Sequence, residues 1–244
     1  MSELAGELEE LKNFVLKKVC FVQVPNKWRF ICDGQFTWEF VYLDINSYKF
    51  VKSNEFLLLT DDKNNKYINV NNRCLDEVDK YLYIYTENAF NKPTNDCFTF
   101  TSFYFEVKIK FETANKDDVL MDIGLIRDNE MVYLSKTCDA ICYKQMGQSG
   151  KISVPSLTFN DGDAYGCGII YSPTKMSGIS PPQIFHTQNG QLIGKAVKVK
   201  DHSSYQPWIE LKLCSVETNF GNDLTTKPFK YAISKHIVTD EFYN

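Results

Sequence analysis

The sequence predicts an all-β fold, either an antiparallel sandwich or a barrel, on three observations. Many short apolar runs are separated by segments rich in glycine, proline and asparagine. Aromatic residues make up 14% of the 244 residues, and aromatic side chains favour strands. Strand patterns do not alternate with helical ones, as they would in a parallel sheet covered by helices.

The N-terminal residues 2–18 have the periodicity of a helix. Leu4, Leu8, Leu11 and Val15 recur every three or four residues, as on one helix face. Glutamates precede lysines along this segment, which suits the helix dipole. We expect a short helix that packs on a sheet or, alternatively, detaches and docks on a partner.

The following residues, up to about position 70, change to strand patterns. Aromatic and polar residues alternate from Phe36 to Tyr42, and apolar residues dominate from Tyr48 to Leu59. A polar turn then leads to Tyr67–Val70. We expect extra strands in this part of the chain.

Clearer strand patterns begin at Tyr81–Tyr85. Every second residue from Phe103 to Phe111 is apolar, which predicts a strand with one buried face. Val119–Ile126 is more continuously apolar and predicts another strand. A charged loop and a hydrophilic segment around residues 143–150 follow.

The stretch from Asp161 to Gly194 holds six of the twelve glycines. Asn189-Gly190 lies between apolar runs, which predicts a hairpin because both turn residues take positive φ. Gly166 and Gly168 lie inside an apolar run, where glycine permits close packing. Further alternating segments predict the last strands, Trp208–Leu213 and Val216–Gly221.

Taken in order, these segments resemble the SPRY domain, most closely the Ran-binding-protein-M type. The matching motifs are YFEVKI (104–109), IGLI (123–126), GDAYGCGI (162–169), IFHTQNGQLIG (184–194), PWIEL (207–211), VETNFG (216–221) and PFKY (228–231). The resemblance implies a bent sandwich of two antiparallel sheets over residues 65–236, acting as a non-catalytic interaction module. It leaves residues 1–64 as an N-terminal extension of helix and strands, of unknown role.

Charge and cysteine usage narrow the class of partner. The net charge of −4 argues against nucleic-acid binding, which needs a basic face. No apolar run reaches the roughly 18 residues of a membrane span. The eight cysteines are scattered, several in apolar strands where a thiol packs as a small hydrophobe. Because the N-terminus also lacks a leader pattern, we expect a cytoplasmic or nuclear protein.

We expect no catalytic residues and no enzyme activity. The sequence has three histidines and no G-x-S-x-G nucleophile motif. The one enzymatic alternative is a cysteine hydrolase that uses Cys167 with His186. The apolar strand around Cys167 would raise its thiol pKa, and burial of its sulfur would rule this pair out.

We also expect no metal and no cofactor. Cys138 and Cys142 have the spacing of half a zinc site, but no second pair follows at a suitable distance. Asp161-Gly162-Asp163 begins like a calcium loop, but Ser172 stands where the bidentate glutamate belongs. The simpler interpretation of Asp161–Asp163 is a turn.

The resemblance also implies where a partner binds, because peptide-binding members use loops at the strand ends. Carried over by position, it points to the loop at residues 87–95 and to the partner-binding residues Thr113, Asn115, Arg127, Asp128, Asn129, Tyr133, Leu213, Cys214 and Ser215. Arg127 and Tyr133 are the expected anchors, since Arg and Tyr dominate interface hot spots. Trp208 is expected to pack within the fold rather than stack on a base.

The function expected from these observations is binding of a short peptide segment of a partner protein. The chain would act as an adaptor or scaffold, for instance in a ubiquitin ligase complex. A secreted effector or a glycan-binding sandwich is the alternative, because glycan binders share this architecture.

Overall fold

The computed structural model describes most of the chain after residue 18. The described residues are 19–33, 41–42, 50–52, 55–62, 65–72, 82–94, 98–145, 147–174, 180–201 and 204–238. The expected helix over residues 2–18 and most of the alternating segment 36–42 lie outside them.

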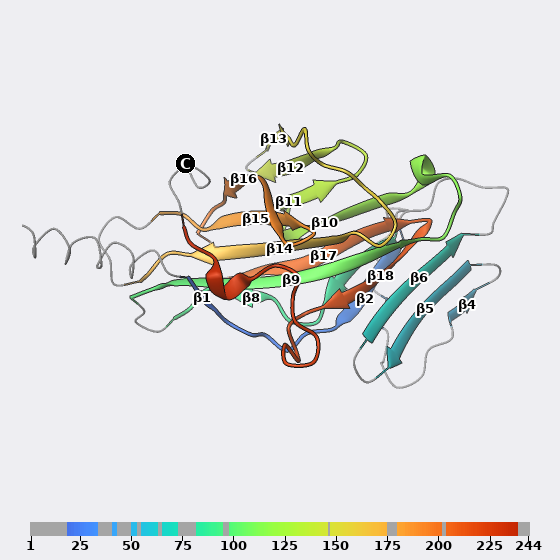
Figure 1. Cartoon of the computed structure of the whole chain (residues 1–244), viewed down its shortest axis with the longest axis horizontal. Coiled ribbons are helices and arrows are strands. Elements are labelled where there is room, and N and C mark those ends of the chain that lie inside the picture. Colours follow the sequence, from blue (N-terminus) through green and yellow to red (C-terminus); the bar gives the residue numbers. More distant parts are fainter. Residues whose placement is uncertain are drawn as a thin grey trace, which may run out of the picture.

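The described strands form two antiparallel sheets with open strand orders, so the all-β sandwich prediction is confirmed (Figure 1). The first sheet has the order β16 (Gln191–Lys198), β15 (Gln183–Gln188), β14 (Ala164–Tyr171), β9 (Phe100–Phe111), β18 (Cys214–Asn219), β6 (Asn65–Asn72), β5 (Glu55–Asp62) and β4 (Phe50–Lys52). The short β1 (Val19–Phe21) pairs in parallel with β9, on the edge that β18 occupies farther along.

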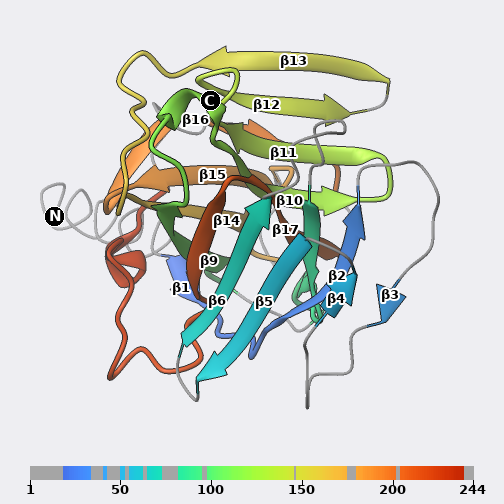
Figure 2. The same cartoon turned by 90° about the vertical axis from the view of Figure 1, so that its right-hand side faces the viewer.

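The second sheet is built in the same way. Its order is β13 (Gln148–Ser153), β12 (Ala140–Gln145), β11 (Glu130–Ser135), β10 (Leu120–Arg127), β17 (Ser204–Lys212), β7 (Leu82–Thr86), β2 (Trp28–Asp33) and β3 (Val41–Tyr42), and Figure 2 shows β13 to β11 stacked along its upper edge. β8 (Phe90–Asn91) continues the edge of β17 beyond β7. Two short 3₁₀ turns, η1 (Lys116–Asp118) and η2 (Ile233–Lys235), complete the described elements.

The main core lies between the two sheets. Every second residue of β9 from Phe103 to Ile109 enters it, as the alternation predicts. The other face of β9 was expected to be exposed, and this is wrong for Tyr104 and Glu106, which are buried. The C-terminal segment, residues 229–238, packs over that face and forms a second, smaller core with Tyr104 and Phe185.

The glycine-rich stretch folds as the sequence predicts. Asn189 and Gly190 take φ values of 49° and 84° in the turn between β15 and β16. A Cβ on Gly166 would lie 2.0 Å from the Tyr104 hydroxyl, and one on Gly168 would lie 2.5 Å from the Phe185 ring. These two glycines therefore let aromatic side chains lie directly on the strand.

The hydrophilic segment around residues 143–150 forms part of the β12–β13 hairpin. Gln145 pairs with Gln148 across its turn. The sequence does not show this strand pair because β13 lies at the sheet edge with most of its side chains exposed. Without a buried face, a strand has no apolar alternation.

The described strands of the N-terminal extension belong to the same two sheets. Val19 in β1 pairs with Phe100, Ile31 in β2 pairs with Ile84, and β5 pairs along its whole length with β6. The division of the chain at residue 64 stays a prediction.

Candidate functional site

The predicted binding residues lie in three places along the β10–β17 strand pair. Leu120 pairs with Lys212 at one end and Ile126 with Gln206 at the other, a separation of roughly 20 Å for six extended residues. Thr113, Asn115, Leu213, Cys214 and Ser215 lie beyond the first end, here called the Leu213 end. Arg127, Asp128 and Asn129 lie at the second, the Arg127 end. Tyr133 pairs with Gly124 near the middle.

Polar groups at the Leu213 end are largely occupied within the fold. The Glu112 N–H donates to the Leu213 carbonyl at 3.1 Å, and the Ser215 hydroxyl donates to the Glu112 carboxylate at 2.7 Å. Leu213 itself has a positive φ of 53°. These contacts fasten the β17–β18 connection to the end of β9.

Two further predicted residues at this end have structural roles. The Cys214 sulfur lies 3.2 Å from the Leu120 carbonyl oxygen, and burial raises the pKa of its thiol to about 12. The Asn115 side chain accepts the Asp117 N–H at 3.2 Å and so caps η1. The exposed surface at the Leu213 end is therefore the loop over residues 114–118.

The Arg127 end offers an exposed turn on a rigid support. Asp128 and Asn129 form a two-residue connection between β10 and β11, with Asp128 at φ 52° and its side chain 81% exposed. Arg127 Nη1 donates to the Ser204 carbonyl at 3.3 Å and to the Ser204 hydroxyl at 3.0 Å. The turn is thus held by β17 while its polar tip faces solvent.

The loop after β7 borders the same end, because Asn91 in β8 pairs with Ser204. Two ion pairs lie at this end: Lys92 of the loop pairs with Asp201 at 2.6 Å, and Lys200 pairs with Glu130 at 2.6 Å. The rim around the Arg127 turn therefore carries charges of both signs.

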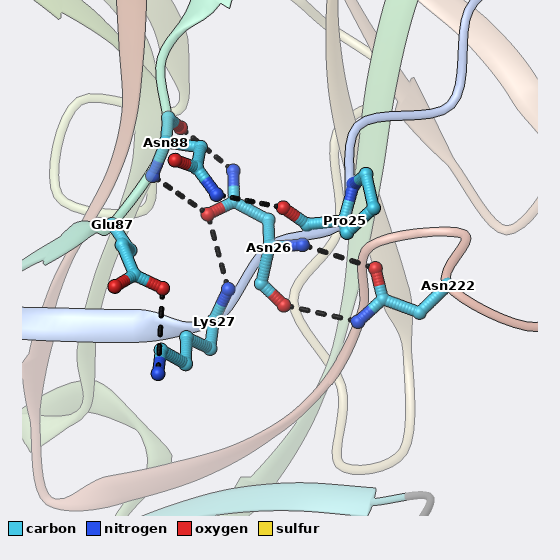
Figure 3. Close-up of polar contacts among 6 residues, drawn as sticks. All are labelled: Pro25, Asn26, Lys27, Glu87, Asn88 and Asn222. Carbon is cyan, nitrogen blue, oxygen red and sulfur yellow. Dashed lines mark hydrogen bonds and ion pairs between the residues drawn. The ribbon is translucent and has the colours of Figure 1, made fainter.

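Three asparagines anchor the start of this loop (Figure 3). The Asn26 amide donates to the Asn88 carbonyl at 2.7 Å and its side-chain oxygen accepts the Asn88 N–H at 3.0 Å. The Asn222 side chain accepts the Asn26 N–H at 3.1 Å and donates to its carbonyl at 3.0 Å. This asparagine clamp joins the β1–β2 segment to the loop after β7 and to the chain after β18.

Tyr133 lies on the outer face of the second sheet, away from both loop groups. Its β11 neighbours Val132 and Leu134 point into the core, so its own side chain points outward. The ring meets Trp208 edge-on at a centroid distance of 5.5 Å, and burial raises the pKa of the Tyr133 hydroxyl. On the other side of Trp208 lies Tyr83, at 6.2 Å. Trp208 packs within the fold, as expected.

Asp122 and Glu210 share that outer face, and sequence reasoning missed them. They pair directly across β10 and β17, and both are buried. Burial raises the pKa of Asp122 to about 6 and that of Glu210 to about 7, and in Glu210 the charge of Asp122 adds to the shift. A lone acid inside each apolar run, VLMDIGLI and WIELKL, was the available signal.

The cysteine-hydrolase alternative is wrong because Cys167 and His186 are buried and their pKa values shift in the unfavourable directions. Cys167 and His186 face each other across β14 and β15, and both are completely buried. Burial raises the pKa of the Cys167 thiol and lowers the pKa of His186 to about 4. A thiolate with an imidazolium needs the opposite shifts, and substrate has no access to the sulfur.

The possible metal sites are a structural turn and a pair of neighbouring free thiols. The Asp163 carboxylate accepts hydrogen bonds from Asn160, Tyr165 and Asn189, the last at 2.8 Å. Burial would raise the pKa of Asp163, but these bonds together lower it. Cys138 and Cys142 are free thiols. Within the described part of the chain, no three His, Cys, Asp or Glu side chains are grouped to hold a metal ion.

None of the helices in the described ranges is long and apolar enough to cross a membrane. No protein-family model and no curated protein matches the chain.

Solved structures that resemble it include three small domains. The TRIM65 PSpry domain has 9% identity over 90% of this chain and 99% of that one, with a TM-score of 0.39. The SPRY domain of human HERC1 has 12% identity over 59% and 84%, with a TM-score of 0.35. The carbohydrate-binding module CBM66 from Bacillus subtilis has 9% identity over 63% and 83%, with a TM-score of 0.37. No family assignment follows from likenesses at this level.

Proposed function

We propose that this chain is a non-enzymatic protein-interaction module that binds a short peptide segment of a partner through loops at the strand ends. Support comes from the ordered SPRY-like motifs in the sequence and from the two-sheet sandwich. The observation that carries the proposal is the Arg127 turn, which is exposed at its tip and anchored to Ser204 at its base. Such rigidly supported loops are where sandwiches carry binding residues.

Within the nine predicted binding residues, Arg127, Asp128 and Asn129 are the favoured contacts. Their neighbours present charges of both signs, which suits a polar peptide whose own charges are complementary. Thr113 and Asn115 with Leu213, Cys214 and Ser215 form a second stretch that a long partner segment could reach. The module would serve as an adaptor or scaffold in the cytoplasm or nucleus, with a ubiquitin ligase complex as one setting.

Affinity capture on the intact chain, followed by mass spectrometry, tests the proposal when wild type and matched variants are compared. Asp128→Asn removes a charge but keeps a residue that tolerates positive φ, and Asn129→Ala removes the adjacent amide. Lys151→Ala, on the exposed edge strand β13, is the control. We expect a specific partner to bind wild type and the control and to be reduced at least about fivefold on the double variant, as for loss of a contact of about 1 kcal/mol. Equal recovery of every partner from all three proteins would refute the assignment.

A further inference from the structure

The outer face of the second sheet holds buried polar groups that the fold leaves unsatisfied. We define the acid–aromatic cluster as Asp122, Glu210, Trp208, Tyr83 and Tyr133. They come from four neighbouring strands, β7, β17, β10 and β11, and point away from the main core. Asp122 is 7% exposed, Glu210 8% and Trp208 2%.

Two atoms of this cluster have no hydrogen-bond partner among the residues that the structure describes. Asp122 Oδ1, an acceptor, and Trp208 Nε1, a donor, are both buried without one. A buried polar atom left unpaired costs about 1–3 kcal/mol, and native folds contain few of them. A ligand that offers both a donor and an acceptor would satisfy these two atoms together.

The two carboxyl groups also lack a compensating cation. Directly opposed residues on antiparallel strands have Cβ atoms roughly 5 Å apart, so two ionised carboxylates here repel each other. Within the described residues, no lysine or arginine charge contributes to the raised pKa of Asp122 or Glu210; the opposing contacts are hydrogen bonds from Ser135, the Lys136 backbone and Tyr83. A bound cation would let both groups ionise.

We propose that the acid–aromatic cluster is a binding site for an arginine residue of a partner protein or peptide. A guanidinium supplies several planar N–H donors, enough for Asp122 Oδ1 and the Glu210 carboxylate together. Its plane can lie against the rings of Tyr133 or Tyr83, a cation–π contact. A backbone carbonyl beside the arginine accepts the hydrogen bond of Trp208 Nε1. A metal ion fits less well, because it offers Trp208 no acceptor.

This site goes beyond the Arg127 turn, which lies five residues farther along β10, roughly 17 Å away. The two can therefore fail independently. Asp122→Asn and Glu210→Gln remove the charges without changing side-chain size, so both variants should fold. Glu217→Gln, on the first sheet and paired with Lys227, is the matched control.

The test uses three pools of acetylated, amidated heptapeptides with a central arginine, lysine or citrulline and uncharged mixed flanks. Binding to the immobilised intact chain is measured at concentrations up to about 1 mM, where weak single-residue contacts are visible. We expect the arginine pool to bind about tenfold better than the isosteric, neutral citrulline pool, as charge-assisted hydrogen bonds allow. The lysine pool should fall between them, because an ammonium cannot bridge both carboxylates in one plane.

The Asp122→Asn/Glu210→Gln double variant should bind the arginine pool no better than the citrulline pool. Glu217→Gln and Asp128→Asn should keep the preference. Three results would overturn the proposal: equal binding of arginine and citrulline pools to wild type, an arginine preference that survives in the double variant, or no binding of any pool. If Asp128→Asn loses partner capture but keeps the arginine preference, the result bears on peptide binding at the Arg127 turn and leaves the arginine site standing.

Discussion

Each of the two sheets buries a carboxyl group on its outer face, but only the first sheet satisfies it. Both oxygens of Glu106 accept hydrogen bonds at 2.8 Å, from the backbone N–H groups of Lys230 and Tyr231 and from the Tyr104 hydroxyl. On the second sheet, one oxygen of Asp122 has no hydrogen-bond partner in the described part of the chain, and Asp122 faces another carboxyl group. The difference is that the C-terminal segment supplies donors to one face and leaves the other without them.

This comparison separates structural acids from candidate binding acids. Burial raises the pKa of Glu106 too, but its backbone donors and the charge of Lys230 oppose the shift. A carboxylate with a full set of internal partners fixes the fold. A buried carboxyl group with an empty acceptor position stores unfavourable energy that a partner can relieve.

The largest expected effect follows from removing the satisfied acid. Glu106→Ala leaves two backbone N–H groups and one hydroxyl without an acceptor, and we expect a loss of about 4 kcal/mol in unfolding free energy. Urea unfolding measures the loss, and hydrogen exchange at Lys230 and Tyr231 should accelerate. Glu217→Ala, which breaks a partly exposed ion pair with Lys227, should cost no more than about 1 kcal/mol. Similar losses in both variants would contradict the structural role of Glu106.

For Asp122 and Glu210, in contrast, we expect that removal of a carboxyl charge increases the free energy of unfolding. The pKa of Asp122 is raised to about 6 in the folded state. The contribution of this carboxyl group to the free energy of unfolding is therefore fully present below its unfolded-state pKa, and it is lost as the pH rises through about 6. Glu210 behaves in the same way up to about pH 7. Asp122→Asn should therefore stabilise the protein by about 2 kcal/mol at about pH 8, but hardly at about pH 4.

Urea unfolding of wild type and Asp122→Asn across this pH range measures the effect. The titratable groups that face Asp122 are Glu210, Tyr83, Tyr133 and Cys142. Because the charge of Asp122 raises the pKa of Glu210, part of the gain in the variant comes from easier ionisation of Glu210. An equal effect of the substitution at both ends of the range would show that the carboxyl charge is not the cause.

A smaller effect is expected from removing one hydroxyl group that hydrogen-bonds to Glu106 on the first sheet. Tyr104→Phe removes the hydroxyl that donates to Glu106 and lies 2.7 Å from the Thr187 hydroxyl. Because this hydroxyl is buried against Gly166, we expect a loss of about 1–2 kcal/mol in unfolding free energy. Thermal or urea unfolding decides it, and an unchanged stability would mean that water replaces the hydroxyl.

The smallest effect is expected from removing a tyrosine hydroxyl on the outer face of the second sheet. Tyr83→Phe removes the hydrogen bond to Glu210, but Tyr83 is partly exposed, so unfolding free energy should change by less than about 1 kcal/mol. Since that bond lowers the pKa of Glu210, its removal should raise this pKa further. Carboxyl NMR titration measures the shift, and a fall in the Glu210 pKa would contradict the arrangement.

The sequence predicts strands with one buried face and turns with special backbone geometry. The alternation from Phe103 to Ile109 and the Asn189-Gly190 hairpin are both confirmed because each depends on local chemistry. The β12–β13 hairpin escaped prediction because its edge strand buries no face.

The two outer faces could not be predicted for a different reason. The pairing of Asp122 with Glu210 joins strands 88 residues apart, since 210 − 122 = 88. Nothing in either apolar run states which residue lies opposite, and nothing in β9 indicates that residues 229–238 cover it. Loop positions such as Arg127 and Leu213 could be taken from the family resemblance, but their separation to opposite strand ends appears only with the pairing register.

The asparagine clamp also constrains the order in which the chain can fold. Asn26 bonds to Asn222, 196 residues later, and the buried Trp28 indole donates to Thr218, 190 residues later, at 2.8 Å. During synthesis from the N-terminus, these two side-chain contacts therefore form only after residues 218–222 have been made. The strand edges themselves pair earlier, β2 with β3 and β7 and β1 with β9. Attachment of the β1–β2 segment to the chain after β18 should accordingly be among the last steps of folding.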